Sequence, residues 1–382
     1  SLEGPRRNVN VVVKAAAGLL LVIMVPMEVL LQDSFEYYGG VAITYMQEHW
    51  YSHQGGNFFH AFNYITSSLV LTMLAVILFH VYEPTKAIKF AVVTSTGMYL
   101  ASLINMIYAE PRPYWVYGHI KARFCERSYA TPSSQLVLVL IVTGYFLVEY
   151  PLSRTVRLVI GWVMGLVIGL LFYGQMYMGV LFPHQLLVTL VYAFVYITGS
   201  FMLDSTISKI VRQSCFNFRK NRVSVVKWYL VTIAMLLLAI TIYDELTLAY
   251  NTNIQWIKHA TVRPKQADCD FEYDVGNSYS FFISAYIFFQ LGFVVGAMFL
   301  HKFYHESWWH TPYWKRGIRA FIGVGTVLSI HSLFDLLPND DTTTEYTFNY
   351  AIPNYLSGFL TTMPLTYLCT YMRLVNKQYR LL

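Results

Sequence analysis

Three short stretches that contain polar and charged residues lie between long apolar runs of this 382-residue sequence, and their residue types could bind an anion or transfer a proton. They read NMIYAEPRPYW (105–115), TPSSQ (131–135) and YGQMYMGVLFPHQ (173–185). Arg112 offers a fixed cation for an anion, and His184 offers an imidazole that could transfer a proton. Ser133 and Ser134 add hydroxyl groups. The sequence thus suggests an anion-binding site, provided that these stretches meet in the folded chain.

The surrounding sequence has the composition of an integral membrane protein. It is 56% apolar and 13% charged, whereas soluble domains carry about 25% charged residues. A membrane-spanning helix needs about 20 mainly apolar residues. Ten such runs are predicted, at 11–32, 58–82, 88–108, 134–150, 156–173, 182–203, 226–247, 279–301, 317–337 and 349–372. The expected fold is therefore an all-α, polytopic membrane protein with about ten transmembrane helices.

The distribution of charge agrees with this count. Ten spans place both termini on one side of the membrane, and that side would hold 20 of the 27 Lys and Arg residues. The opposite side would hold 15 of the 21 Asp and Glu residues. Because basic loops stay on the cytosolic or matrix side, both termini are expected there. The net charge of +6 then belongs to these loops and does not indicate a nucleic-acid partner. The three polar stretches would meet on the opposite side.

The basic segment SKIVRQSCFNFRKNRVSVVK (208–227) is the expected boundary between two membrane regions. It separates a six-span core at 1–207 from a four-span region at 228–382. Two interpretations of the segment stay open. It is an ordinary basic loop on the cytosolic or matrix side, or it is a contact with anionic lipids beside a span.

The three stretches resemble the motifs of the type 2 phosphatidic acid phosphatase superfamily. That family carries K-x6-RP, PSGH and SR-x5-H at these span ends. This sequence retains Arg112 and Pro113, then Pro132 and Ser133, and continues after the third motif with FPHQ at 182–185. It looks most like the branch with glucose-6-phosphatase and the sphingoid-phosphate phosphatases. The resemblance covers about residues 10–204, and it implies a six-helix core to which four C-terminal helices are added.

The residues on which the family's chemistry depends are replaced. Asn105 stands where the family has its Lys, Gln135 where it has the acid His, and Gln175 where it has an Arg. Leu181 stands at the nucleophilic His. Leucine has no lone pair and glutamine does not titrate, so neither can do the work of those histidines. The resemblance therefore implies a pseudophosphatase with no catalytic residues, metal or cofactor.

The remaining polar residues have alternative interpretations. Arg112, Ser133, Ser134 and His184 are candidates to bind a phosphate or lipid headgroup. Arg112 could equally be a helix-terminal residue paired with Glu110, Glu126 or a backbone carbonyl. His184 could be a replacement nucleophile, or a polar residue at the entry of a helix.

Three functions follow, of which we favour the first. The chain is a catalytically inactive structural or lipid-binding subunit of a larger membrane assembly, with membrane lipids and other membrane subunits as partners. Alternatively it is an active lipid- or sugar-phosphate phosphatase with non-standard catalytic residues. The third function is a lipid or solute transporter, which predicts inverted repeats and polar stripes within several spans that the sequence does not show. The expected membrane is that of the endoplasmic reticulum or the mitochondrial inner membrane.

Several further features carry weaker expectations. Glu28 lies within the first predicted span, either as a functional carboxylate or as a side chain reaching the interface. Cys125 and Cys269 fall on one side of the membrane, and the sequence leaves their pairing open. Acidic residues alternate in QADCDFEYDVGNS (266–278) as in a cation loop or a solvated acidic loop. Aromatic residues at 36–56 and 301–316 suggest segments in the membrane interface.

Overall fold

The computed structural model describes residue 26 and residues 30–121, 123, 124, 126–149, 153–216, 223–249, 276–300, 311–337 and 342–375. This part of the chain is helical and contains no β-strand, and an isolated bridge joins Ser128 to Gly276. The chain divides into two compact units. Unit 1 comprises Ser1–Ser67, Ala101–Met202 and Ile242–Phe281, and unit 2 comprises Ser68–Leu100, Leu203–Thr241 and Phe282–Leu382.

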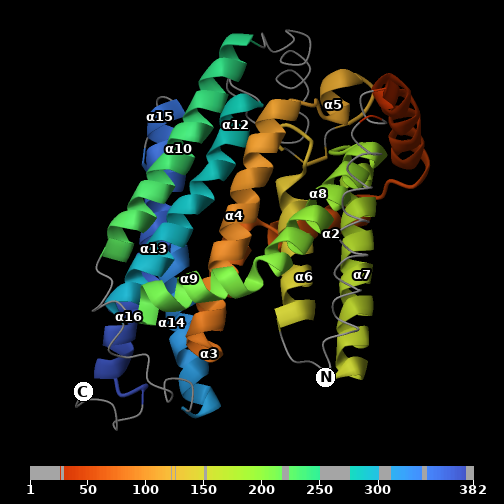
Figure 1. Ribbon diagram of the computed structural model, residues 1–382. Helices are drawn as coiled ribbons and strands as arrows, with labels where there is room; N and C mark the ends of the chain where they lie inside the picture. The colour runs from red at the N-terminus through yellow and green to blue at the C-terminus, as the bar shows by residue number, and fades with distance from the viewer. Residues whose placement is uncertain are drawn as a thin grey trace, which may run out of the picture. The chain divides into compact units, whose positions relative to one another are not determined.

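Unit 1 holds the three polar stretches. Its helices are residues 30–49, α2 (His53–Ile65), α5 (Pro113–Val116), α6 (Ser134–Glu149), α7 (Arg154–Tyr177) and α8 (Pro183–Met202), with the ends of α4 (Pro84–Tyr108) and α10 (Val223–Ala249) and most of α12 (Asn277–Phe282). α6 packs against α7 and α8, and α2 packs against α7. Figure 1 shows α6 and α7 running side by side.

The starts of these helices follow from local sequence. The Ser52 and Ser153 side chains accept hydrogen bonds from the first turns of α2 and α7, which satisfies backbone N–H groups that have no partner within the helix. At α8, Gln185 Oε1 accepts from the Phe182 N–H at 3.0 Å. This is the reciprocal half of a capping box, in which the third helical residue caps the residue before the helix. The FPHQ sequence thus sets where α8 begins.

Unit 2 contains α3 (Ser68–Val81), α9 (Asp204–Phe216), η3 (Ile283–Ala285), α13 (Tyr286–Phe299), α14 (Tyr313–Phe334), α15 (Thr342–Glu345), the π-helical η4 (Tyr346–Ala351) and α16 (Ile352–Tyr371). Its most extensive helix pair is α13 with α16, followed by α3 with α14. Figure 1 shows α13 running beside α16. α13 is largely buried, so it forms the centre of this unit.

The protein is a helical integral membrane protein. Six described helical segments are long and apolar enough to cross a membrane, and the count is seven if the bent pair α2 and α3 forms one span. The six are Pro84–Val116, Arg154–Tyr177, Pro183–Met202, Val223–Thr247, Asn277–Phe299 and Tyr313–Phe334. The described residues therefore support a polytopic helical protein but do not reach the predicted count of ten.

If the bent pair α2 and α3 is taken as the predicted span at 58–82, three other predicted spans account for the difference between seven and ten. The first, at 11–32, falls mostly outside the described residues. The span at 134–150 is the 16-residue helix α6, whose length of about 24 Å is less than the roughly 30 Å of hydrocarbon. The span at 349–372 corresponds to α16, which is not among the apolar candidates. Its sequence IPNYLSGFLTTMPLTYLCTY includes several Thr and Tyr residues as well as Ser and Asn, and these lower its hydropathy.

The compact units divide the chain differently from the predicted boundary at 208–227. α3 and the first part of α4 precede residue 207 but belong to unit 2 with α13, α14 and α16. The reason is close packing of α3 on α14. Gly323 of α14 leaves space that Val76 occupies, since a Cβ at Gly323 would lie 2.6 Å from Val76 Cγ1. His80 Nε2 also lies 3.0 Å from the Thr361 carbonyl oxygen of α16.

The helix at 30–49 has a buried small-residue face and an exposed aromatic face. Gly39 and Gly40 pack against other parts of unit 1, and a Cβ at Gly40 would come within 2.8 Å of the Tyr117 ring. Tyr38 and Tyr45 point outward, with exposed fractions of 71% and 52%. The exposed tyrosines are among the aromatic residues from which an interfacial segment at 36–56 is predicted. Its location in a membrane interface stays a prediction.

Candidate functional site

Arg112 occupies the N-cap of α5 and is only 2% exposed. Its Nε donates to the Ser128 carbonyl at 2.7 Å, and its Nη2 donates to Ser128 Oγ at 3.1 Å and to the Tyr129 carbonyl at 3.0 Å. Nη1 donates to the Val180 carbonyl at 3.4 Å, and Nη2 lies 3.5 Å from Glu126 Oε2. The sequence left two roles open for Arg112, which are headgroup binding and a paired residue at a helix terminus. These contacts match the second role. Four of the five guanidinium N–H groups therefore already donate to protein oxygens.

Gln135 and Gln175 bind each other. Gln175 Nε2 donates to Gln135 Oε1 at 2.9 Å and to Asn63 Oδ1 at 3.0 Å. Gln135 Nε2 donates to the Asn63 carbonyl at 2.6 Å and to Thr66 Oγ1 at 3.0 Å. Both amide groups thereby use their two N–H donors. We call Asn63, Thr66, Gln135 and Gln175 the amide network.

The amide network is closed off from solvent. Its four residues are between 1% and 9% exposed. The Asn63 amide nitrogen is buried and has no hydrogen-bond acceptor among the described residues. Because no member titrates near neutral pH, the network can orient helices but cannot transfer a proton.

Leu181 and His184 are both packed into the interior. Leu181 is 0% exposed and belongs to an apolar cluster with Met178, Leu136 and Leu186. His184, at the start of α8, is 4% exposed. Its ring stacks against Phe35 and Phe182, at centroid distances of 5.8 and 5.5 Å. The imidazole therefore packs between two aromatic rings at the entry of α8.

Ser133 and Ser134 lie at the start of α6. The Ser133 backbone N–H donates to Thr189 Oγ1 at 3.0 Å, and Thr189 Oγ1 donates to the Gln185 carbonyl at 2.7 Å. Ser133 is buried and Ser134 is half-buried. Gln185 Nε2 donates to the Pro111 carbonyl at 3.0 Å. These bonds tie the starts of α6 and α8 to the segment that carries Arg112.

Asn105 joins segments that are distant in sequence. Its Nδ2 donates to the carbonyls of Tyr129 and Pro132 at 3.1 and 3.2 Å. Its Oδ1 accepts from Ser280 Oγ. The Tyr129 N–H in turn donates to Ser280 Oγ at 3.1 Å. Asn105 thus acts as a neutral connector between these segments.

The expectation that the three polar stretches meet is confirmed. Arg112 contacts Val180, Gln175 contacts Gln135, and Asn105 contacts the carbonyl of Pro132. The sequence reasoning missed Asn63, Thr66, Gln185 and Ser280. A sequence signal existed for Asn63 and Thr66, which are polar residues within a predicted apolar span. None existed for Ser280, which is far away in sequence.

The edge of the site near the helix at 30–49 disfavours negative charge. Burial raises the pKa of the Glu36 carboxyl above its ordinary value, although a hydrogen bond from Gln32 at 3.2 Å acts in the opposite direction. Burial also raises the pKa of the Tyr117 phenol, and the nearby Glu36 carboxylate adds to this shift. A phosphate ester would bring further negative charge to this edge.

Several predicted features fall outside the described residues. These are Glu28, Cys125, Cys269 and the acidic positions Asp268, Asp270, Glu272 and Asp274. The same holds for most of the aromatic segment 301–316 and for the middle of the basic segment 208–227.

Comparison with known proteins finds no matching family model, no matching curated protein and no matching solved structure.

We expect Gln175→Leu to lower the free energy of unfolding by about 1–3 kcal/mol, because Asn63 Oδ1 and Gln135 Oε1 each lose a buried donor. The measurement is unfolding in mild detergent, followed by tryptophan fluorescence. The double variant Gln135→Leu/Gln175→Leu should lose less than the sum of the two single changes, since it removes both partners of one hydrogen bond. Strictly additive losses would show that the network is not energetically coupled.

Proposed function

We propose that this protein is a catalytically inactive member of the type 2 phosphatidic acid phosphatase superfamily. In this proposal it serves as a structural or lipid-binding subunit of a larger membrane assembly. The membrane is that of the endoplasmic reticulum or the mitochondrial inner membrane. The proposal rests on the motif resemblance in unit 1 and on what now occupies the motif positions.

The observation that carries the proposal is the hydrogen bond between Gln135 and Gln175, beside a fully buried Leu181. Three polypeptide stretches meet as an active site of this family would require, but side chains that bind each other fill the reactive positions. Phosphoryl transfer depends on a nucleophile and on fixed cations. Here the one motif cation, Arg112, is bound by protein oxygens.

The finer topology is part of the same proposal. Ten spans, comprising a six-helix core and four C-terminal helices, would place both termini on the cytosolic or matrix side. This count needs a span at 11–32 and requires α6 and α16 to cross the membrane, although α6 is short and α16 is weakly apolar. Accessibility of single engineered cysteines to a membrane-impermeant maleimide would test each loop in turn.

The proposed subunit role is tested by the native mass of the protein extracted in mild detergent, with identification of the co-purifying proteins. We expect a complex of fixed stoichiometry that greatly exceeds the 44.1 kDa of one chain. The partners would also identify the organelle. A single chain in its detergent belt would contradict the subunit role.

The proposed loss of catalysis has a separate test. The purified protein should release no phosphate from phosphatidic acid, sphingoid phosphates or sugar phosphates. It should also gain no thermal stability from millimolar vanadate, an analogue of phosphate. Turnover that disappears in Arg112→Met and His184→Ala variants would replace this proposal with the active-phosphatase alternative. Stabilisation by phosphatidic acid without turnover would support headgroup binding at Arg112, Ser133, Ser134 and His184.

A further inference from the structure

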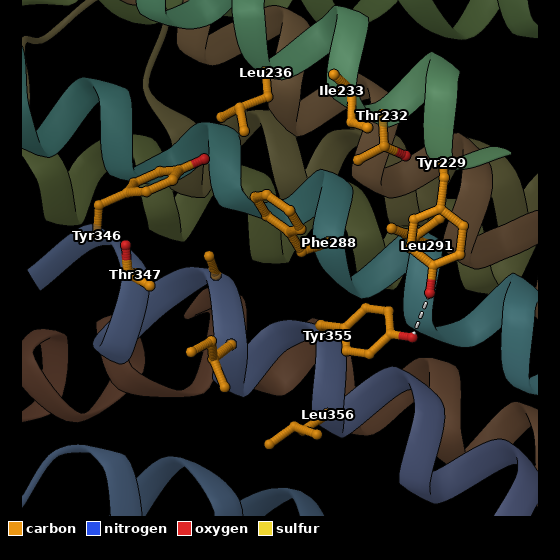
Figure 2. Close-up of a pocket in the computed structure, with 12 residues that line it drawn as sticks. Tyr229, Thr232, Ile233, Leu236, Phe288, Leu291, Tyr346, Thr347, Tyr355 and Leu356 are labelled. Carbon is orange, nitrogen blue, oxygen red and sulfur yellow. Dashed lines mark hydrogen bonds between the residues drawn. The ribbon is translucent and has the colours of Figure 1, made fainter. Parts of the chain in front are cut away.

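Unit 2 contains an apolar pocket with a volume of about 520 Å³. Figure 2 shows that its wall is formed by α10, α13 and the segment from η4 to α16. The lining includes Tyr229, Leu236, Phe288, Leu291 and Tyr355. Pockets that hold small ligands have volumes of about 300–1,000 Å³ and mainly apolar walls. Size and lining therefore match a site for one small apolar molecule.

The pocket wall contains no charged side chain among the residues that the structure describes. Its polar atoms are hydroxyls and backbone groups, and the Thr232 hydroxyl already donates to the Trp228 carbonyl at 2.9 Å. An ionised phosphate or carboxylate would have no counter-ion here, and burying it would be costly. The lining thus selects an uncharged occupant.

One end of the pocket offers a defined polar group. The hydroxyls of Tyr229 and Tyr355 lie 2.8 Å apart and share a hydrogen bond. Figure 2 shows this pair at one end of the pocket, with Leu236 and Tyr346 toward the other end. Each phenol has one O–H donor. Because only one of the two donors serves the bond within the pair, the second can donate to an oxygen of a ligand.

The backbone at the opposite end is also unusual. Tyr346, Thr347 and Ala351 line the pocket from η4, a π-helical turn. Such turns are rare, and they often occur at functional sites. The Tyr346 hydroxyl lies 3.3 Å from Ser284 Oγ, so this ring is held in place by the protein. The wide turn therefore builds a fixed wall opposite the tyrosine pair.

We propose that this pocket binds an uncharged lipid with a compact apolar body and one hydroxyl or carbonyl group, the chemistry shared by sterols and isoprenoid quinones. The apolar body lies against Leu236, Phe288 and Leu291, and the oxygen meets the pair formed by Tyr229 and Tyr355. The proposal concerns unit 2 alone. It does not depend on the proposed loss of catalysis in unit 1.

The test is photolabelling of the full-length protein in phosphatidylcholine nanodiscs. The two probes are a diazirine-bearing cholesterol and a diazirine-bearing short-chain ubiquinone. We expect one probe to label peptides of α10 and α16, and the matching unlabelled lipid to compete while added phosphatidylcholine does not. The probe that succeeds identifies the source of the ligand. Absence of competable labelling with both probes would overturn the proposal.

Variants make the test specific to the pocket. Leu291→Trp fills the pocket and should abolish the competable labelling. Leu333→Trp, on an exposed face of α14, is the matched control and should leave labelling unchanged. Tyr229→Phe/Tyr355→Phe keeps the apolar wall and should weaken binding by roughly 3- to 10-fold through loss of a hydrogen bond. If Leu291→Trp fails to fold, this double variant still tests the proposal. Unchanged affinity in this double variant would rule out the tyrosine pair as the polar contact.

Discussion

Arg112→Met is expected to destabilise the protein by about 3–5 kcal/mol, the usual cost of breaking a buried ionic or charge-assisted network by removing one partner. The guanidinium supplies donors to the buried carbonyls of Ser128 and Tyr129, and it lies 3.5 Å from the Glu126 carboxylate. Methionine fills similar space but donates no hydrogen bond. The free energy of unfolding in mild detergent, obtained from denaturant titration, is the measurement.

Two further variants separate this structural role from a role in ligand binding. Arg112→Lys should recover little of the loss, because one ammonium cannot reproduce the planar guanidinium donors. Arg157→Met removes an arginine from the exposed start of α7 and should change stability by less than about 0.5 kcal/mol. If Arg112→Met were as stable as Arg157→Met, the hydrogen bonds from Arg112 to protein oxygens would not be important for stability. Headgroup binding would then better explain the presence of Arg112.

Gly292→Ala should disrupt unit 2, with a loss of about 3 kcal/mol or more, at or above the upper end of ordinary overpacking. A Cβ at Gly292 would overlap the Tyr355 carbonyl oxygen and would lie 3.0 Å from the Phe359 backbone nitrogen. These are backbone atoms, so no side-chain rotation relieves the overlap. Helices in membranes often approach closely through small residues spaced four apart, as Gly292 and Gly296 are on α13. The loss should appear as a lower melting temperature in detergent.

A matched glycine tests whether this effect depends on position. Gly165 lies on α7, and a Cβ there would meet no atom within 4 Å. Gly165→Ala should be neutral, or should stabilise the protein by up to about 1 kcal/mol, because alanine is the better residue within a helix. Similar losses from both substitutions would mean that the effect does not depend on the contact between α13 and α16. Because Leu291 and Tyr355 adjoin the same contact, Gly292→Ala should also weaken lipid labelling of the pocket.

Much of the helical organisation could be predicted because hydropathy depends on local sequence. Most described spans fall where apolar runs indicated them, for instance α7, α8, α10 and α14. The count of ten was harder to predict, since the length of α6 and the polarity of α16 lie near the limits for a span. The interleaving of the two units was not predictable from the order of the spans. It depends on which helix faces fit together, as α3 and α14 do at Gly323.

The candidate site shows the same division. The sequence alone shows that these positions offer no nucleophile, acid or cation, because they hold Asn105, Gln135, Gln175 and Leu181. Span ends on one side also predicted that the three stretches meet. Only the tertiary structure decided that Gln175 binds both Gln135 and Asn63, and that protein oxygens surround Arg112. The packing of helices determines which residues that are far apart in sequence form hydrogen bonds. The periodicity of apolar residues does not predict these pairs.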